Sequence, residues 1–243
     1  MDLKIKDVAE LLNVSETTIR RWLGDGKIPA YRLNHQYRFN RLEIEDWVMS
    51  HKLGKATNGA IPFHDITKIP VDDQDGLPSS SAGGSKQFSL YRAIHKGGVL
   101  YQVPGKTKEE LIRNTVKLID GDLNLDVDVV SDLLLERESL QSTGLNNGIA
   151  IPHTRDFLLN AHFDMVTVVF PEHPLEYGAL DGKPVHMLFF LFASDGKNHL
   201  HLLAKIAHLS SQPEMLTFLQ SKPTKEKLLA YVKEWESNIQ PRQ

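Results

Sequence analysis

The chain has 243 residues, of which 41% are hydrophobic and 24% charged, a composition typical of a soluble protein with one large or two modest domains. It contains no cysteine, which excludes disulfides and thiolate metal sites and favours a reducing compartment. The N-terminus lacks the apolar core of a signal peptide, and the longest apolar run, 187–193, is far shorter than the roughly 20 residues that cross a bilayer. We therefore expect a cytoplasmic protein without membrane insertion.

Charge is distributed unevenly along the chain. The net charge of −3 argues against a protein that coats nucleic acid along its whole length. Between Arg20 and Arg41, however, six basic residues accompany a single acid, Asp25. This local excess predicts an anionic partner for the N-terminal segment.

The first fifty residues alternate between helical and extended patterns. Apolar residues at 8, 9, 11 and 12 have helical spacing, and Ser15 is a candidate N-cap for a second helix that ends near Leu23. Residues 30–39 alternate as in a hairpin. A closing helix follows over 41–49, and its buried candidates are Leu42, Ile44, Trp47 and Val48. The order helix, turn, helix, wing, helix predicts a small domain over residues 1–52.

The second helix of this domain has a polar and basic outer face. A helix that reads the major groove needs such a face, because base edges are recognised by hydrogen bonds. The candidate DNA-binding residues are Thr17, Thr18, Arg20 and Arg21 on the helix, and Arg32 and Arg38 on the hairpin. A basic surface that binds another protein is the alternative explanation of the charges.

The order of these signals is similar to a known DNA-binding domain. The segment VAELLNVSETTIRRWLGDGKIPAYRLNHQYRFNRLEIEDWV resembles the winged helix-turn-helix shared by excisionases and MerR-type regulators. The resemblance implies that the second helix enters the major groove of duplex DNA and that the wing grips the backbone.

A linker and a second domain follow. Periodicity fades over 53–87, where Asp, Gly, Ser and Pro accumulate, so we expect a flexible linker there. Over 88–237, capping signals at Thr107 and Asp126 begin helices, the second with Val129, Val130, Leu133 and Leu134 inward. Strands are expected at 149–151, 165–170 and 185–193, and further helices at about 199–209, 214–219 and 225–235. This pattern predicts an α/β domain with a sheet covered by helices.

One segment of the second domain joins a histidine to an arginine and a hydroxyl-rich turn. A side chain that carries a phosphoryl group must be nucleophilic, and donors must neutralise the dianion. The segment LLERESLQSTGLNNGIAIPHTR offers Arg137, the turn at 142–144, and His153 after a strand. By itself, each of these residues is more commonly structural or merely exposed.

This segment and NHLHLLAKIA further along the chain resemble enzyme IIA of the fructose/mannitol class of the sugar phosphotransferase system, especially its nitrogen-regulatory branch. The resemblance implies a mixed-sheet fold and a phosphoryl group transferred to His153 from the phosphocarrier HPr or its paralogue. It further implies that His199 and Arg137 support the transfer and that Ser142, Thr143 and Gly144 line the phosphate. No cofactor is implied.

Three functions remain open at this point. The first is a regulator in which phosphorylation at His153 alters DNA binding or the choice of partner. The second is a binding module that kept the fold without phosphorylation. The third is a metal hydrolase with His153, His199 and His201 as ligands, although no carboxylate–histidine spacing accompanies them. A homodimer is possible, because helix-turn-helix proteins of this size commonly bind two half-sites.

Overall fold

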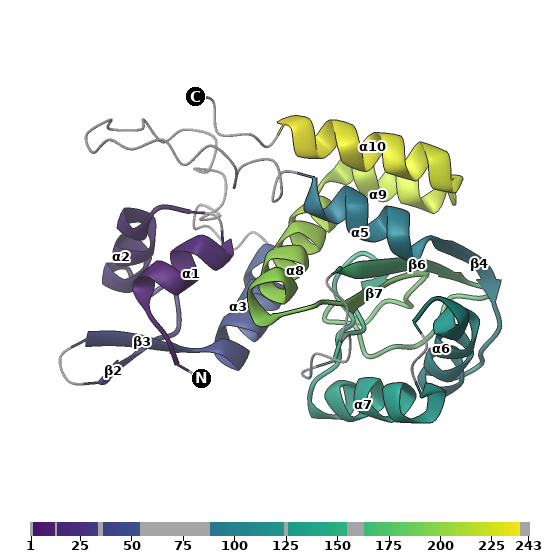
Figure 1. Ribbon diagram of the computed structural model, residues 1–243, viewed down its shortest axis with the longest axis horizontal. Coiled ribbons are helices and arrows are strands. Elements are labelled where there is room, and N and C mark those ends of the chain that lie inside the picture. Colours follow the sequence, from purple (N-terminus) through teal and green to yellow (C-terminus); the bar gives the residue numbers. More distant parts are fainter. Residues whose placement is uncertain are drawn as a thin grey trace.

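The computed structural model describes residues 2–12, 14–33, 36–53, 88–123, 126–154 and 163–238. The linker expected over 53–87 lies, apart from its first residue, outside these ranges, and so does the tip of the wing. The described residues form a small N-terminal unit beside a larger body of sheet and helices (Figure 1).

The N-terminal unit is a helix-turn-helix with a hairpin wing. Its elements are β1 (Asp2–Leu3), α1 (Ile5–Leu12), α2 (Glu16–Gly24), β2 (Tyr31–Leu33), β3 (Gln36–Asn40) and α3 (Arg41–Leu53). The three strands pair antiparallel in the order β1-β3-β2. Ser15 caps α2 as expected, because its Oγ accepts a hydrogen bond from the backbone N–H of Thr18. The rings of Trp22 and Trp47 lie 5.5 Å apart and join α2 to α3.

The larger unit surrounds a four-stranded mixed sheet. Its elements are α5 (Ser89–Gly97), β4 (Val99–Val103), α6 (Lys108–Leu123), α7 (Val127–Leu140), β5 (Ile149–Ala150), β6 (Met165–Pro171), β7 (Met187–Phe192), α8 (Gly196–Ser210), α9 (Pro213–Gln220) and α10 (Lys225–Asn238). The strand order is β4-β6-β7-β5, with β4 parallel to β6, β6 antiparallel to β7, and β5 parallel to β7. The expected mixed α/β fold is confirmed.

Helices cover both faces of this sheet. In β6, Val166, Val168 and Phe170 belong to a core shared with α5, α8, α9 and α10, whereas Met165 and Val169 belong to a core shared with α6 and α7 (Figure 1). Because both faces are buried, β7 is a continuous apolar run, and β6 is one interrupted only by the buried Thr167.

Several details of the sequence-based expectations are wrong. In α7, Val129 is exposed and Leu133 only half-buried, because the inward face follows Val130 and Leu134 and then continues through Arg137. Leu42 is exposed as well, since Ile44, Trp47 and Val48 form the apolar face of α3. The segments of β1, α5 and β4 were not predicted, and the strand expected over 185–193 is shorter at both ends.

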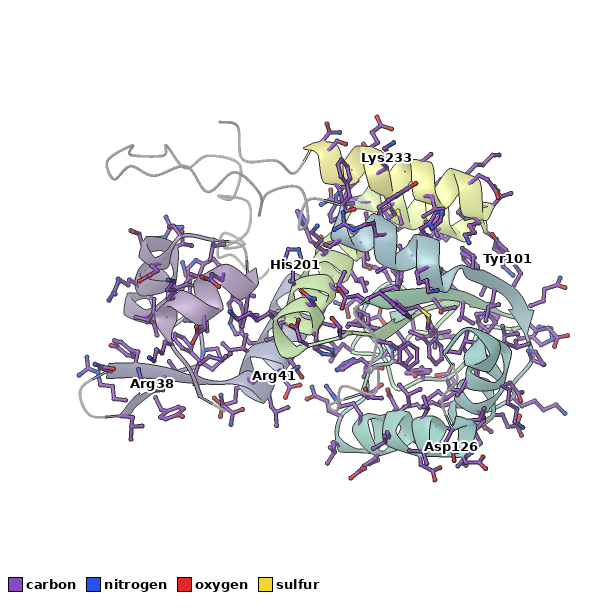
Figure 2. All side chains as sticks on the ribbon, viewed as in Figure 1. Arg38, Arg41, Tyr101, Asp126, His201 and Lys233 are labelled. Carbon is purple, nitrogen blue, oxygen red and sulfur yellow. The ribbon has the colours of Figure 1, made fainter. Side chains whose placement is uncertain are left out.

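The two units are in direct contact. Helices α1 and α3 pack against α8, and the buried residues of both units form one continuous apolar cluster. Figure 2 shows the consequence for two arginines: Arg38 on the wing lies far from the larger unit, whereas Arg41 at the start of α3 lies beside it. The helix-turn-helix unit is therefore docked on the larger one through α1 and α3, while α2 and the wing are turned away.

Candidate functional site

His153 follows the short strand β5 by three residues and lies beside the central strand β7. Its backbone bridges to Leu191 of β7, whose N–H donates to Pro152 O at 2.9 Å. The Nδ1 atom of His153 lies 2.7 Å from Ile151 O. Since a carbonyl oxygen can only accept, Nδ1 carries the proton, and Nε2 holds the lone pair that can act as a nucleophile.

His199 faces His153 from the first turn of α8. This helix begins where it does because the Asp195 carboxylate accepts hydrogen bonds from the N–H groups of Lys197 and Asn198. The two imidazole rings have centroids 5.1 Å apart. Burial lowers the pKa of His199 well below its usual value, and the neighbouring His153, Arg41 and Arg137 lower it further. His199 is therefore a neutral imidazole at pH 7.

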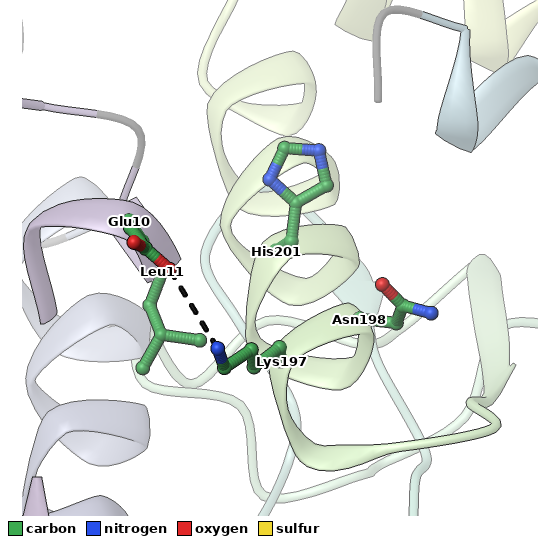
Figure 3. A pocket seen from close by; sticks show the side chains of 5 residues that line it. All are labelled: Glu10, Leu11, Lys197, Asn198 and His201. Atoms are coloured by element: carbon green, nitrogen blue, oxygen red, sulfur yellow. Dashed lines mark ion pairs between the residues drawn. The ribbon is translucent and has the colours of Figure 1, made fainter. Parts of the chain in front are cut away.

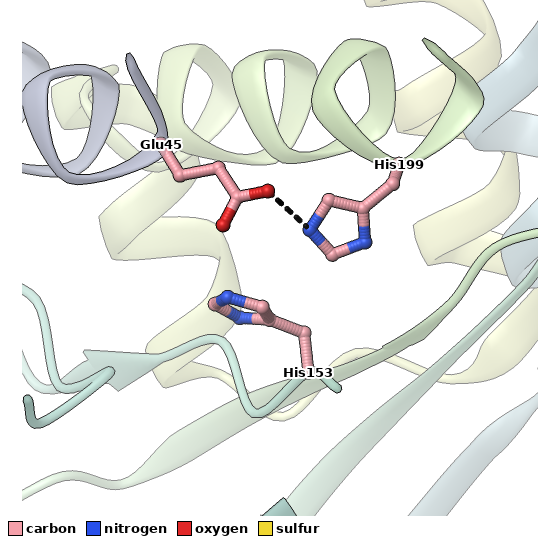
Figure 4. A group of neighbouring side chains, drawn as sticks. All are labelled: Glu45, His153 and His199. Carbon is pink, nitrogen blue, oxygen red and sulfur yellow. Dashed lines mark ion pairs between the residues drawn. The ribbon is translucent and has the colours of Figure 1, made fainter. Parts of the chain in front are cut away.

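A third group reaches the same place from the N-terminal unit. The Oε1 atom of Glu45, on α3, lies 3.6 Å from Nε2 of His199 and 3.1 Å from Nε of Arg41. One ligand atom from each of Glu45, His153 and His199 lies within 4.8 Å of the others, and all three residues are buried (Figure 4). Burial raises the pKa of Glu45, and the charges of Arg41 and Arg137 oppose this rise. The contact of Glu45 with His199 is not an ion pair, because the imidazole is neutral.

Arg137 is buried at the end of α7. Its Nη1 donates to Gln141 O at 3.0 Å, and its Nη2 lies 3.5 Å from Oδ1 of Asp46. The guanidinium thus approaches the same helix α3 that carries Glu45, and its charge acts on both His199 and Glu45. The structure brings together the three residues that the sequence proposed as catalytic: His153, His199 and Arg137.

The turn formed by Ser142, Thr143 and Gly144 is held from behind. The hydroxyl and N–H of Thr143 both donate to the carboxylate of Glu138, and Ser142 Oγ donates to Tyr177 O at 2.9 Å. Gly144 N–H donates back to Ser142 Oγ. Thr143 O accepts from Ile151 N–H at 3.1 Å, so the turn braces the strand that leads to His153. The part these residues take in phosphate binding stays a prediction.

His201 does not join the histidine pair. Among the described residues, the group with metal-ligand geometry is Glu45, His153 and His199, and His201 instead lines a small pocket with Glu10, Leu11, Lys197 and Asn198 (Figure 3). This corrects the metal-ligand set proposed from the sequence, because two residues along a helix turn the side chain by about 200°. The sequence showed no carboxylate at metal-ligand spacing from these histidines; in the structure Glu45 of the N-terminal unit lies beside them.

The candidate DNA-reading residues are mostly on the surface. Thr17, Arg20 and Arg21 are exposed on α2. Thr18 is only 7% exposed, and its hydroxyl pairs with Ser15 Oγ at 3.0 Å. Thr18 therefore completes the cap of α2 instead of facing outward as expected.

The two arginines of the wing are braced by polar neighbours. Arg32 Nη2 donates to the hydroxyl of Tyr37 at 3.1 Å, and Arg38 Nη2 donates to Gln36 Oε1 at 2.9 Å. These contacts hold the guanidinium groups along the wing without burying their charge.

Comparison with known families agrees with this geometry. The profile described as "Phosphoenolpyruvate-dependent sugar phosphotransferase system, EIIA 2" matches residues 93–235, more than half of the chain. The chain belongs to this phosphotransferase EIIA family. A helix-turn-helix domain profile matches residues 3–52.

The relatives of this EIIA family member support the nitrogen-regulatory branch. A nitrogen regulatory protein of Pseudomonas aeruginosa is 34% identical over 146 residues, which are 59% of this chain and 94% of that protein. A fructose-specific EIIA component of the phosphotransferase system from Haloferax volcanii is 32% identical over 139 residues, 54% of this chain and 88% of that protein. The crystal structure of the nitrogen regulatory protein IIA-Ntr from Neisseria meningitidis superposes with a TM-score of 0.51 at 29% identity, and covers 56% of this chain and 93% of that chain.

Sequence reasoning missed the acidic side of the site. Glu45 and Asp46 lie in the segment read only as a closing helix, and their contacts with His199 and Arg137 join positions far apart in the sequence. A weak signal was present: Arg41 and Glu45 are four residues apart and share a face with Val48, so an acid lies on a face that buries apolar residues.

None of the helices among the described residues is both long and apolar enough to span a membrane.

Proposed function

We propose that this EIIA family member is a phosphotransferase-linked regulator that accepts a phosphoryl group on Nε2 of His153 and binds duplex DNA through α2 and the wing. The observation that carries the first half is the 2.7 Å contact between Nδ1 of His153 and Ile151 O. With Nδ1 as the donor to Ile151 O, Nε2 carries the lone pair of the nucleophile; the His199 ring lies 5.1 Å from the His153 ring between centroids, and the charge of Arg137 acts on His199. The donor is a phosphohistidine of an HPr-like phosphocarrier protein.

The transfer balances without an external acid or base. The bond from Nε2 of His153 to phosphorus forms while the nitrogen–phosphorus bond of the donor breaks, and the electron pair of that bond returns to the donor ring. The donor leaves as a neutral imidazole when its other nitrogen carries a proton. His153 keeps the proton on Nδ1, and Ile151 O stabilises the positive ring. Arg137 neutralises the charge that spreads over the phosphoryl oxygens in a loose transition state.

The DNA half rests on the exposed basic face of the helix-turn-helix unit. Arg20 and Arg21 on α2 and Arg32 and Arg38 on the wing lie on the part of the unit that is turned away from α8. Their charges suit a phosphate backbone, and the helix suits a major groove. Two copies bound to adjacent half-sites would require an operator with twofold symmetry.

Labelled phosphoenolpyruvate tests the phosphoryl acceptor. With the general phosphotransferase proteins and an HPr-like carrier present, the full chain should take up label, and His153→Ala should take up none. The matched control is His173→Ala, which removes an exposed imidazole and should label as the parent does. A parent chain that takes up no label would favour the second candidate, a regulatory module that kept the EIIA fold without the chemistry.

A further inference from the structure

Helix α3 places two carboxylates against the groups that would hold the phosphoryl group. Glu45 approaches His199, with Oε1 and Nε2 3.6 Å apart, and Asp46 approaches Arg137, with Oδ1 and Nη2 3.5 Å apart. Both acids come from the helix-turn-helix unit, and both of their partners come from the EIIA domain. The acids therefore contact the phosphoryl-binding groups from outside the domain that does the chemistry.

The docked helix also closes the site. His153 is 1% exposed and His199 is 2% exposed, and the carboxylate of Glu45 points toward both rings (Figure 4). In-line transfer needs the donor phosphorus about 3 to 3.5 Å from the attacking nitrogen. A donor protein cannot bring its own phosphohistidine that close while α3 occupies the approach.

The charges around the cluster select an anion rather than a metal ion. Arg41 and Arg137 both act on Glu45 and on His199. Two guanidinium groups beside the cluster disfavour a dication and favour negative charge at the position of the Glu45 carboxylate. A phosphoryl group on Nε2 of His153 would add nearly two negative charges at that position.

We propose that α3 is an intramolecular partner of the phosphohistidine site, with Glu45 and Asp46 standing in for the phosphoryl group, so that docking of the helix-turn-helix unit and phosphorylation of His153 exclude one another. This inference rests on the proposed function, since it requires His153 to be the acceptor. The undocked form accepts the phosphoryl group, and the phosphorylated form cannot close again, because the new dianion would face the two carboxylates of α3.

Surrounding contacts make this docking a defined state. Leu11 and Val48 of the N-terminal unit belong to the same buried cluster as Leu200 and Leu203 of α8. At the rim of this contact between α1 and α8, Nζ of Lys197 lies 3.6 Å from Oε2 of Glu10 (Figure 3). The apolar contacts hold the units together, and the acids of α3 make the attachment sensitive to charge at His153. Helix α2 and the wing lie on the side of the helix-turn-helix unit away from α8. Undocking therefore lets this unit move, but α2 and the wing are already accessible in the docked form.

The test follows phosphorylation rate and docking in the same full-length molecules. The chain has no cysteine, so Lys6→Cys on α1 and Lys117→Cys on α6, both exposed, accept a fluorescent donor and acceptor without side reactions. Phosphorylation by the HPr-like carrier should lower energy transfer between the labels, and His153→Ala should show no change. Phosphorylation with unchanged energy transfer would overturn the exclusion and leave the acceptor assignment intact. Failure of every variant, the parent included, to take up a phosphoryl group would overturn both the exclusion and the assignment of His153 as the acceptor.

Glu45→Gln should shift the chain toward the open form and raise the phosphorylation rate on the order of 10-fold, because the rate follows the open fraction. The matched control is Glu43→Gln, the same change at an exposed position of the same helix, which should leave the rate at the parent value. Equal rates for Glu45→Gln and Glu43→Gln would contradict the proposal.

A second pair of variants covers the case in which Glu45→Gln fails to fold. Lys197→Glu repels Glu10 at the rim and should raise the phosphorylation rate, whereas Lys197→Glu combined with Glu10→Lys should restore it. A rescue that fails would overturn the proposal. So would Zn²⁺ that raises energy transfer in the parent and not in Glu45→Gln, since the cluster would then be a metal-held joint.

Discussion

The helix-turn-helix unit has two charged faces, and they differ in how their charges are used. On α2 and the wing, Arg20, Arg21 and Arg32 are exposed and Arg38 is half-buried, and the wing arginines make short-range contacts such as that of Arg38 with Gln36. On α3, Glu45 is buried and contacts groups of another domain. Exposed charges are screened and act on partners in solution, whereas buried charges act strongly on each other. One small domain can therefore present one charged face to a partner in solution and another to the EIIA domain.

The largest expected effect concerns a buried pair in the EIIA domain. Glu236 is 2% exposed, contacts Nζ of Lys205, and accepts the N–H groups of Leu90 and Tyr91 at the start of α5. Glu236→Ala takes the carboxylate from the Lys205 ammonium, which also donates to Ser89 Oγ, and removes the acceptor of the two N–H groups, so urea unfolding should show a loss of about 3 to 5 kcal/mol. The comparison is the exposed pair Asp25–Lys27 of the helix-turn-helix unit. Asp25→Asn should lower the free energy of unfolding by at most about 1 kcal/mol. Similar losses for both would show that burial does not strengthen a charged contact in this protein.

The next effect concerns phosphoryl transfer itself. Arg137→Ala and His199→Ala should each slow transfer to His153 on the order of 10²-fold, as expected when one donor to a developing anion is removed. The fold should survive, which circular dichroism can check. The matched control is Arg113→Ala, which removes a half-buried arginine of α6 whose partners are Glu109 and Asp132. Transfer at the parent rate in Arg137→Ala would show that this guanidinium serves only its contacts with Gln141 O and Asp46.

A smaller effect is expected at the exposed face. Replacing Arg20 and Arg38 together with alanine should weaken binding of a random-sequence duplex roughly 10-fold at low salt and reduce the salt slope by about 1 per lost phosphate contact. Titration at several salt concentrations, with Arg113→Ala as the control, measures both. Binding that is insensitive to salt would assign the basic face to a protein partner instead.

The sequence predicted more of the fold than of the site's surroundings. Local signals were sufficient for α2, whose cap at Ser15 and apolar positions Ile19 and Trp22 all lie within one segment. The buried strands β6 and β7 were also visible as apolar runs. The short strand β4 was not predicted, because its residues are mostly half-buried or exposed at the edge of the sheet and form no apolar run. Its pairing with β6 depends on a partner that follows much later in the chain.

The site divides in the same way. His153, Arg137 and His199 could be proposed because family motifs surround each of them. Glu45 and Asp46 could not, since their importance arises only when α3 docks on α8. Thr18 shows the reverse error: its position near the helix start suggested a phosphate contact, but Ser15 holds its hydroxyl inward. Local patterns predict elements, whereas contacts between domains follow from packing that no single segment encodes.

The smallest expected effect is on the pH dependence of stability, and it comes from the buried face. Burial lowers the pKa of His199 in the folded chain, so near and below the unfolded value of about 6.5 the unfolded state binds more protons than the native state. Stability should therefore fall as the pH is lowered from 7.5 to 6, by up to about 1 kcal/mol from this residue. The raised pKa of Glu45 acts in the opposite direction. Its carboxyl binds protons more readily in the native state than in the unfolded state, so its contribution to the free energy of unfolding decreases as the pH rises. His199→Gln removes the histidine contribution alone, so urea unfolding at the two pH values should show a smaller loss on acidification than in the parent. A loss equal to that of the parent would mean that His199 titrates alike in both states and that the α3 face is wetter than its burial indicates.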